Sequence, residues 1–192
     1  MPAPSIFISY SHTDEAWKDR LATHLGVLQH EGLLDPWDDR RIGAGADWRQ
    51  EIQQAIEQAR VAILLVSADF LTSQFIVEQE APRFLERRQR EGLHIVPVLV
   101  RPCPWQHVPW LCSIQSRPRD GRALAAGNEY QIDADLAAIA DEVLTLVLPL
   151  HSGVTPAAAA PTRPALVSLA RLPSTNPELF CRETELARLD AA

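Results

Sequence analysis

The stretch Ile6–His12, which reads I-F-I-S-Y-S-H, decides the fold of this chain. It begins as an apolar run and then breaks abruptly into small and polar groups. Fully apolar strands are typical of a parallel sheet covered on both faces, and the carboxyl ends of such strands border the ligand crevice. We therefore expect Ser9, Tyr10, Ser11 and His12 to lie where a bound molecule can touch them.

Further short apolar runs, at 33–37, 61–67 and 95–100, alternate with segments of helical spacing. This alternation predicts an α/β fold with a central parallel sheet of about five strands and helices on both faces. Helices are expected at about 15–29, 47–59, 75–90 and 133–148, with Asp14 and Asp133 capping the first and the last. Pro82 predicts that the regular part of the third helix begins near Glu80 or is kinked there. The fifth strand is placed near Ser113–Ser116, in a proline-rich segment.

Composition excludes several classes of partner and site. The chain has 192 residues, 46% of them hydrophobic, and a formal net charge of -7, so we expect neither nucleic acid nor a membrane as a partner. No run of ~18 apolar residues predicts a membrane span, and the first strand begins too close to Met1 to leave room for a signal peptide. The three cysteines have no C-x-x-C spacing and the six histidines no ligand spacing, so we expect no metal site and a cytoplasmic protein with reduced thiols.

The composition also changes along the chain. The first domain is expected to span residues 1–150. The segment V-T-P-A-A-A-A-P-T-R-P, which begins at Val154, is typical of a semi-extended linker, placed at 151–175. Residues 176–192 are then expected to begin a truncated downstream module. Because no G-x-x-x-x-G-K-[ST] loop occurs in the sequence, the chain is not itself a phosphate-loop NTPase.

Three motifs in order carry a family resemblance: F-I-S-Y-S-H-x-D-E (Phe7–Glu15), W-D-D-R-R-I-x-x-G-x-x-W (Trp37–Trp48) and S-A-D-F-L-T-S-Q-F-I-V-E-Q-E (Ser67–Glu80). Together they resemble the bacterial Toll/interleukin-1 receptor (TIR) domains over roughly residues 4 to 150. The resemblance implies a flavodoxin-like three-layer fold. It also implies one of two functions, since many bacterial and plant members cleave nicotinamide from NAD, whereas many animal members only assemble signalling complexes. The segment Asn176–Leu189 resembles the entry to a STAND-type NTPase module, with Cys181 in place of the usual glycine.

The resemblance assigns Glu80 as the catalytic carboxylate, with Glu78 as the competing choice. The two lie about 200° apart around a helix, so only one can enter a cleft. Family spacing after the aromatic residue allows a gap of four or five residues, and Glu80 fits the longer one. A carboxylate there stabilises the positive charge that develops on the ribose as the bond to nicotinamide breaks. Without the resemblance, the simplest interpretation of either residue is a solvated glutamate on a helix.

The predicted substrate-binding residues are Tyr10, Ser11, Trp37, Asp38, Arg40, Trp48 and Phe75. Hydroxyl groups suit ribose or phosphate, aromatic faces suit the nicotinamide ring, and an arginine suits a phosphate or an acidic neighbour. Each has an alternative role. Core packing is favoured over substrate contact for Trp37, helix packing remains open for Trp48 and Phe75, and the charged loop that starts at Asp38 is solvated in the simplest interpretation.

The expected function is that of an NAD+ nucleosidase that gives ADP-ribose or a cyclic isomer. NAD is its substrate, and no cofactor is expected. In this family a neighbouring subunit often completes the site, so we expect activation by self-association through TIR–TIR contacts, triggered by a downstream sensor module in bacterial antiphage defence. The alternative is a non-catalytic TIR interaction module that self-assembles for signalling.

Overall fold

Four parallel strands form the centre of the fold in the computed structural model, which describes residues 3–38, 41 and 47–148. In spatial order they are β2 (Asp35–Trp37), β1 (Ser5–Ser9), β3 (Val61–Val66) and β4 (His94–Leu99). Phe7 of β1 is in register with Trp37 on one side and Ala62 on the other. This 2-1-3-4 order is that of the flavodoxin-like α/β fold, so the expected fold class is confirmed.

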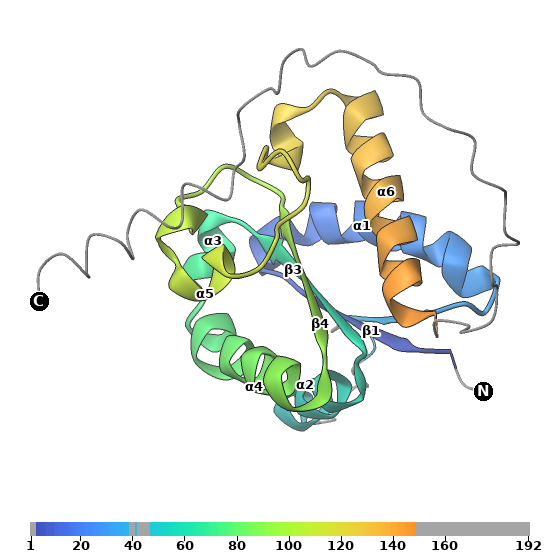
Figure 1. The fold of residues 1–192 in the computed structure, drawn as a ribbon, viewed down its shortest axis with the longest axis vertical. Helices are drawn as coiled ribbons and strands as arrows, with labels where there is room; N and C mark the ends of the chain where they lie inside the picture. Colours follow the sequence, from blue (N-terminus) through green and yellow to red (C-terminus); the bar gives the residue numbers. More distant parts are fainter. Residues whose placement is uncertain (1–2, 39–40, 42–46, 149–192) are drawn as a thin grey trace, which may run out of the picture. The chain divides into compact units, whose positions relative to one another are not determined.

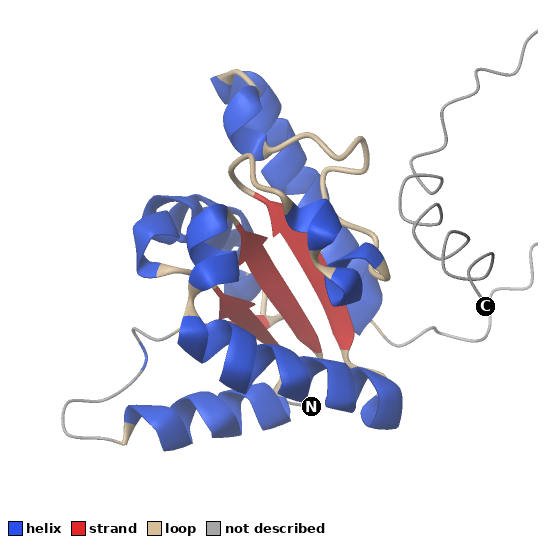
Figure 2. Ribbon diagram, turned by 90° about the vertical axis from the view of Figure 1, so that its left-hand side faces the viewer, coloured by secondary structure: helices blue, strands red, loops and turns tan. Residues whose placement is uncertain are grey.

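Helices cover both faces of the sheet (Figures 1 and 2). The two longest, α1 (Glu15–His30) and α6 (Glu129–Val147), pack on one face, and α2 (Trp48–Gln58) and α4 (Ala81–Glu91) pack on the other. The short helices α3 (Ala68–Thr72) and α5 (Pro109–Cys112) join the second cluster. Single helical turns occur at 12–14, 76–80, 105–107 and 124–126.

The alternation of side chains along β1 assigns each residue to one face of the sheet. Ile6 and Ile8 pack with α1 and α6, whereas Phe7 packs with α2 and α4. Successive side chains of a strand point to opposite faces, so Ser9 follows Phe7 to the α2/α4 face. Tyr10, one residue further on, packs against the α1/α6 cluster instead.

The expected fifth strand is not present among the described residues. Residues 113–116 form no strand, and Arg117 makes an isolated bridge to Val98 of β4. Its N–H donates to the carbonyl of Pro97 at 2.7 Å, and its carbonyl accepts from Leu99 at 2.8 Å. The next residue is Pro118, whose ring fixes φ at about −65°, away from the value of about −120° of a regular parallel strand, and pairing ends after one residue.

Of the two predicted aspartate caps, Asp14 holds the expected N-cap position of α1 and Asp133 is not a cap. The Asp14 side chain is fully buried and makes no capping hydrogen bond, because it accepts hydrogen bonds from Ser67 and Arg101 instead. The last helix begins at Glu129, earlier than expected, with Asn128 as its cap, while Asp133 sits inside it and pairs with Arg20 at 2.8 Å. The sequence near a helix start does not show whether an aspartate there has a hydrogen-bond partner far along the chain, as Asp14 has in Ser67 and Arg101.

The third helix has the composite form that Pro82 indicated. A π-helical turn, Ile76–Glu80, precedes the regular helix α4, which begins at Ala81 with the proline in its first turn. Proline is tolerated there because the first-turn N–H groups have no partner inside the helix. Glu80 is therefore the last residue of the π turn.

Within the described residues, every helix is too short or too polar to span a bilayer. Cys103 and Cys112 form no disulfide within the described residues, and the thiol of Cys112 donates to the carbonyl of Gln106 at 2.9 Å. The predicted linker at 151–175, the predicted downstream module at 176–192 and Cys181 all lie outside the described residues.

Candidate functional site

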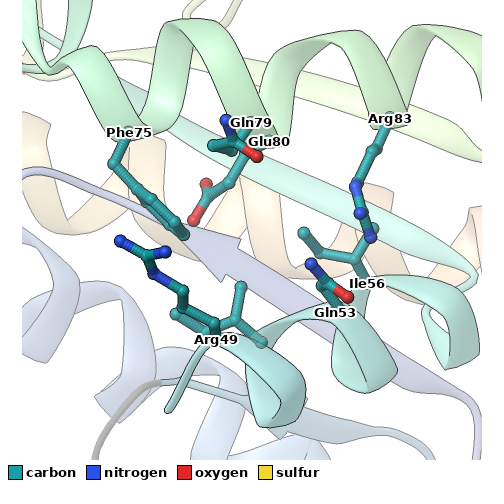
Figure 3. A pocket seen from close by; sticks show the side chains of 8 residues that line it. Arg49, Gln53, Ile56, Phe75, Gln79, Glu80 and Arg83 are labelled. Atoms are coloured by element: carbon teal, nitrogen blue, oxygen red, sulfur yellow. The ribbon is translucent and has the colours of Figure 1, made fainter. Parts of the chain in front are cut away.

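A pocket lies between α2 and the π turn that leads into α4 (Figure 3), with a cavity volume of about 180 Å³. Its lining comes from two helical segments: Arg49, Ile52, Gln53 and Ile56 of α2, and Phe75, Gln79, Glu80 and Arg83 of the opposite wall. The lining combines apolar side chains with polar and charged ones. Such a combination can hold an apolar ring on the apolar groups and orient it through the polar groups.

Glu80 is the buried acid of this pocket. It is 5% exposed, and its carboxylate accepts a hydrogen bond from the hydroxyl of Ser9, the last residue of β1. Glu78, by contrast, is exposed and accepts from the Gln74 amide at 3.1 Å. Of the two glutamates that the sequence left as candidates, Glu80 is the one that faces the cavity.

Aromatic side chains form one edge of the pocket. Phe75 lines it, and the ring of Trp48 lies 5.0 Å from that of Phe75, tilted by 53°. The guanidinium of Arg49 lies 5.3 Å from the centre of the Trp48 ring, which is a cation–π distance. Trp48 is 45% exposed, so it packs on Phe75 at the protein surface and not in the core between helix and sheet.

Trp37 and Tyr10 pack elsewhere. Trp37 stacks on Phe7 with ring centroids 5.2 Å apart, and it belongs to the apolar cluster under α2 and α4. Tyr10 lies under the buried Lys18, whose Nζ is 5.5 Å from the ring centre, and contacts His12 edge-on. Neither residue lines the pocket.

Ser11 and Asp38 are also outside the pocket lining. The Ser11 carbonyl accepts the N–H of Asp14 at 2.7 Å and so closes the turn before α1. Asp38 accepts from Lys18 Nζ at 3.3 Å and anchors the start of the loop after β2 to helix α1. Arg40, the remaining predicted binding residue, lies outside the described residues.

A second polar cluster joins the segments that follow β1, β3 and β4. The fully buried Asp14 accepts two hydrogen bonds. One comes from the hydroxyl of Ser67, the residue after β3, and the other from Nε of Arg101, which follows β4, at 2.8 Å. Arg101 also pairs with Asp69. These hydrogen bonds to Asp14, and then to Asp69, raise the pKa of Arg101, so the guanidinium keeps its charge and links the segments that follow the strands.

Sequence reasoning placed Ser9 among the residues that a bound molecule can touch, but it did not select Arg49, Gln53 or Arg83 as site residues. Two periodic signals were available. Strand alternation separates Ser9 from Tyr10, and helical spacing places Arg49, with positions three, four and seven residues later, on one stripe of α2. The same rule puts Arg83 one turn after Glu80. What the sequence did not show is which stripe of α2 faces which stripe of α4.

The sequence model of the TIR domain family matches residues 6–132. The chain belongs to the TIR domain family. The uncharacterized protein y4lF of Sinorhizobium fredii (strain NBRC 101917 / NGR234) is 36% identical over 174 residues, which are 91% of this chain and 51% of that protein. The chain thus spans about half the length of this curated relative.

Among solved structures, the TIR domain of the Toll-related receptor TRR-2 from Hydra magnipapillata is 23% identical, with a TM-score of 0.40 over 54% of this chain and 78% of that one. The TIR domains of the activated Roq1 resistosome, which directly recognises the pathogen effector XopQ, are 19% identical. Their TM-score is 0.43, over 72% of this chain and 84% of that chain.

Proposed function

We propose that this TIR domain is an NAD+ nucleosidase with Glu80 as its catalytic carboxylate. One observation carries the proposal: Glu80 is buried in a small pocket, aimed at the cavity and held by a hydrogen bond from Ser9. Glutamate is rarely buried in a folded protein, and a buried carboxylate that lines a cavity is a candidate for a functional group. The pocket is also of a size for the nicotinamide end of NAD.

The proposed reaction breaks the bond between ribose C1′ and the pyridinium nitrogen. The electron pair leaves with nicotinamide, which becomes neutral, and positive charge develops on the ribose carbon and ring oxygen. The Glu80 carboxylate stabilises that charge. It then accepts a proton from the water that attacks C1′, which gives ADP-ribose, while attack by a group of the substrate itself gives a cyclic isomer. Ser9 fixes the carboxylate in place through its hydroxyl.

The aromatic edge supplies the binding surface for the leaving group. The rings of Phe75 and Trp48 offer faces to the nicotinamide ring, and the exposed part of Trp48 is open to a ligand. We place Tyr10, Ser11, Trp37 and Asp38 outside the primary pocket. Their proposed role is to shape the strand ends and the loop after β2.

We propose that clustering of TIR domains activates the enzyme in the cytoplasm. Trp48 is exposed at the pocket edge and Val77 on the adjoining π turn, so a second copy packed there would cover these apolar side chains and fix the edge of the site around the substrate. Depletion of NAD by the clustered enzyme is the proposed antiphage action. A host carrying Glu80→Ala should lose phage protection, and full protection by that variant would refute the role.

The decisive experiment measures nicotinamide release from NAD by concentrated wild-type chain, Glu80→Gln and Glu78→Gln. Glutamine has nearly the shape of glutamate and still accepts a hydrogen bond from Ser9, so the pocket should keep its form. We expect activity to be lost in Glu80→Gln and retained in Glu78→Gln. No release by the wild-type chain, even when it is forced to cluster, would favour the alternative of a self-assembling interaction module.

A further inference from the structure

Two arginines of the pocket differ from most other arginines of the domain. Arg49 and Arg83 both line the cavity, and within the described residues neither forms an ion pair with a carboxylate. Most other described arginines do form such pairs: Arg20, Arg41, Arg87, Arg90, Arg101, Arg117, Arg119 and Arg122. In a chain of net charge -7, two arginines and the single acid Glu80 give the lining of this cavity an excess of positive charge.

The two guanidinium groups approach the cavity from opposite walls. Arg49 extends from α2 toward Phe75, and Arg83 extends from α4 toward Gln53 and Ile56, with Glu80 between them in the view of Figure 3. Arg83 is half-buried. The charges of the pocket therefore run positive, negative and positive across its width.

NAD carries the complementary charges. Its pyridinium ring is positive and must lie at Glu80 for the proposed reaction, while its two phosphates are negative. The cavity volume of about 180 Å³ is below the range of about 300–1,000 Å³ typical of pockets that enclose a drug-sized ligand. The nicotinamide end therefore fills the cavity, and the phosphates remain at its mouth. The negative phosphates and the Glu80 carboxylate repel each other, so binding requires cations close to the phosphates.

We propose that Arg49 and Arg83 bind the diphosphate of the dinucleotide substrate and so select a nucleotide over a simple nicotinamide riboside. The inference rests on the proposed nucleosidase function. Guanidinium groups suit this task because they donate paired hydrogen bonds to phosphate oxygens and keep their charge at every physiological pH. The arginines act on binding, while Glu80 and Ser9 act on the bond that breaks.

The test uses three substrates that share the scissile bond: NAD, nicotinamide mononucleotide with one phosphate, and nicotinamide riboside with none. The variants are Arg49→Gln, Arg83→Gln and the double variant. The control is Arg88→Gln, which removes the same charge from an exposed site on α4 outside the pocket. Melting temperatures of all variants identify any loss of fold. If Arg83→Gln unfolds, Arg83→Lys, which keeps the charge but not the paired N–H donors, is measured in its place.

We expect KM for NAD to rise about tenfold in each single variant and about a hundredfold in the double variant, with kcat little changed. For nicotinamide riboside, kcat/KM should change less than about twofold, and the mononucleotide should lie between the two. Arg88→Gln should match the wild type. An equal loss on all three substrates, or no loss on NAD, would overturn the proposal.

A binding measurement separates this proposal from the proposed function. Titration of the wild-type chain with ADP-ribose, followed calorimetrically, needs no bond cleavage. If ADP-ribose binds and the double variant weakens it about a hundredfold, the phosphate site stands even where nicotinamide release fails. If NAD is cleaved but ADP-ribose binds both proteins equally, the nucleosidase stands and the arginine site does not.

Discussion

Removal of a charge from Asp38 should destabilise the domain more than removal of the buried cation with which it pairs. Lys18 is 1% exposed at its side chain, and its Nζ lies 2.8 Å from Asp19 Oδ1 and 3.3 Å from Asp38 Oδ2. The two acids differ in solvent contact, since the Asp19 side chain is 48% exposed and that of Asp38 is 19% exposed. The ammonium group is therefore the member of this set that depends most on its partners.

The magnitudes follow from what each substitution leaves behind. Lys18→Met keeps most of the apolar stem and leaves two acids that still reach water, so we expect a loss of about 1–2 kcal/mol in the free energy of unfolding. Asp38→Asn leaves the ammonium buried with a single charged partner, and we expect a loss of about 2–4 kcal/mol. The double variant should cost about as much as Lys18→Met alone, because the buried charge is then absent.

Urea unfolding of the three variants and the wild type, with equal slopes, measures these differences. Melting temperatures should fall by about 2–4 °C for each kcal/mol. A larger loss for Lys18→Met than for Asp38→Asn would refute the reasoning, because the stabilisation would then come from packing of the lysine stem and not from charge. Additive losses in the double variant would also refute it.

Three further predictions test the site and its surroundings. Trp37→Ala should lower the free energy of unfolding by about 2–3 kcal/mol, whereas Trp48→Ala should cost about 1 kcal/mol but weaken NAD binding about tenfold; urea unfolding and substrate titration measure both, and the opposite ranking would contradict the assigned positions. Ser9→Ala should lower kcat about tenfold by freeing the pocket carboxylate, and Ser9→Thr, which keeps the hydroxyl, should retain most of the activity; equal rates for the two variants would exclude a role for the hydroxyl. The hydrogen bond from Arg117, and then its charge, hold the pKa of Glu142 below the ordinary value of 4.5, so this pair stabilises the fold above that value and stops doing so as the pH falls through the lowered pKa. Glu142→Gln should therefore flatten the loss of stability as the pH falls below 4.5 and through the lowered pKa, as measured by urea unfolding at each pH, and an unchanged slope would contradict the pairing.

The sheet could be predicted because its signal is local. Each strand is a short apolar run bounded by polar or turn residues, and burial on both faces requires that composition wherever the strand lies in the sheet. The strand predicted at Ser113–Ser116 was wrong because a strand also needs a partner along its length, and this segment of the chain pairs with β4 only through the isolated bridge at Arg117. Pairing of that kind depends on backbone geometry that composition does not encode.

The candidate site, like the sheet, was predictable only where its signal in the sequence is local. Glu80 followed from the motif, and in the structure it is buried and lines the pocket. Strand alternation predicts which face of the sheet Tyr10 lies on. Whether Tyr10 can then line the pocket depends on which helices cover that face, and the strand pattern does not give that. Arg83 became visible only when α2 and α4 were placed together, because the two segments that line the pocket are separated in sequence by the whole of β3.

The π turn at Ile76–Glu80 has a consequence for how related chains should be aligned. A π-helical turn holds one residue more than an α-helical turn over nearly the same rise, and the residue after it is rotated by roughly 100° relative to a regular helix. A homologue with one residue fewer between the aromatic side chain and the acid can therefore deliver its carboxylate to the same point through an ordinary turn. An alignment without a gap here would match Glu80 to a neighbouring residue of such a homologue, and would count two enzymes with the same pocket as one active and one inactive.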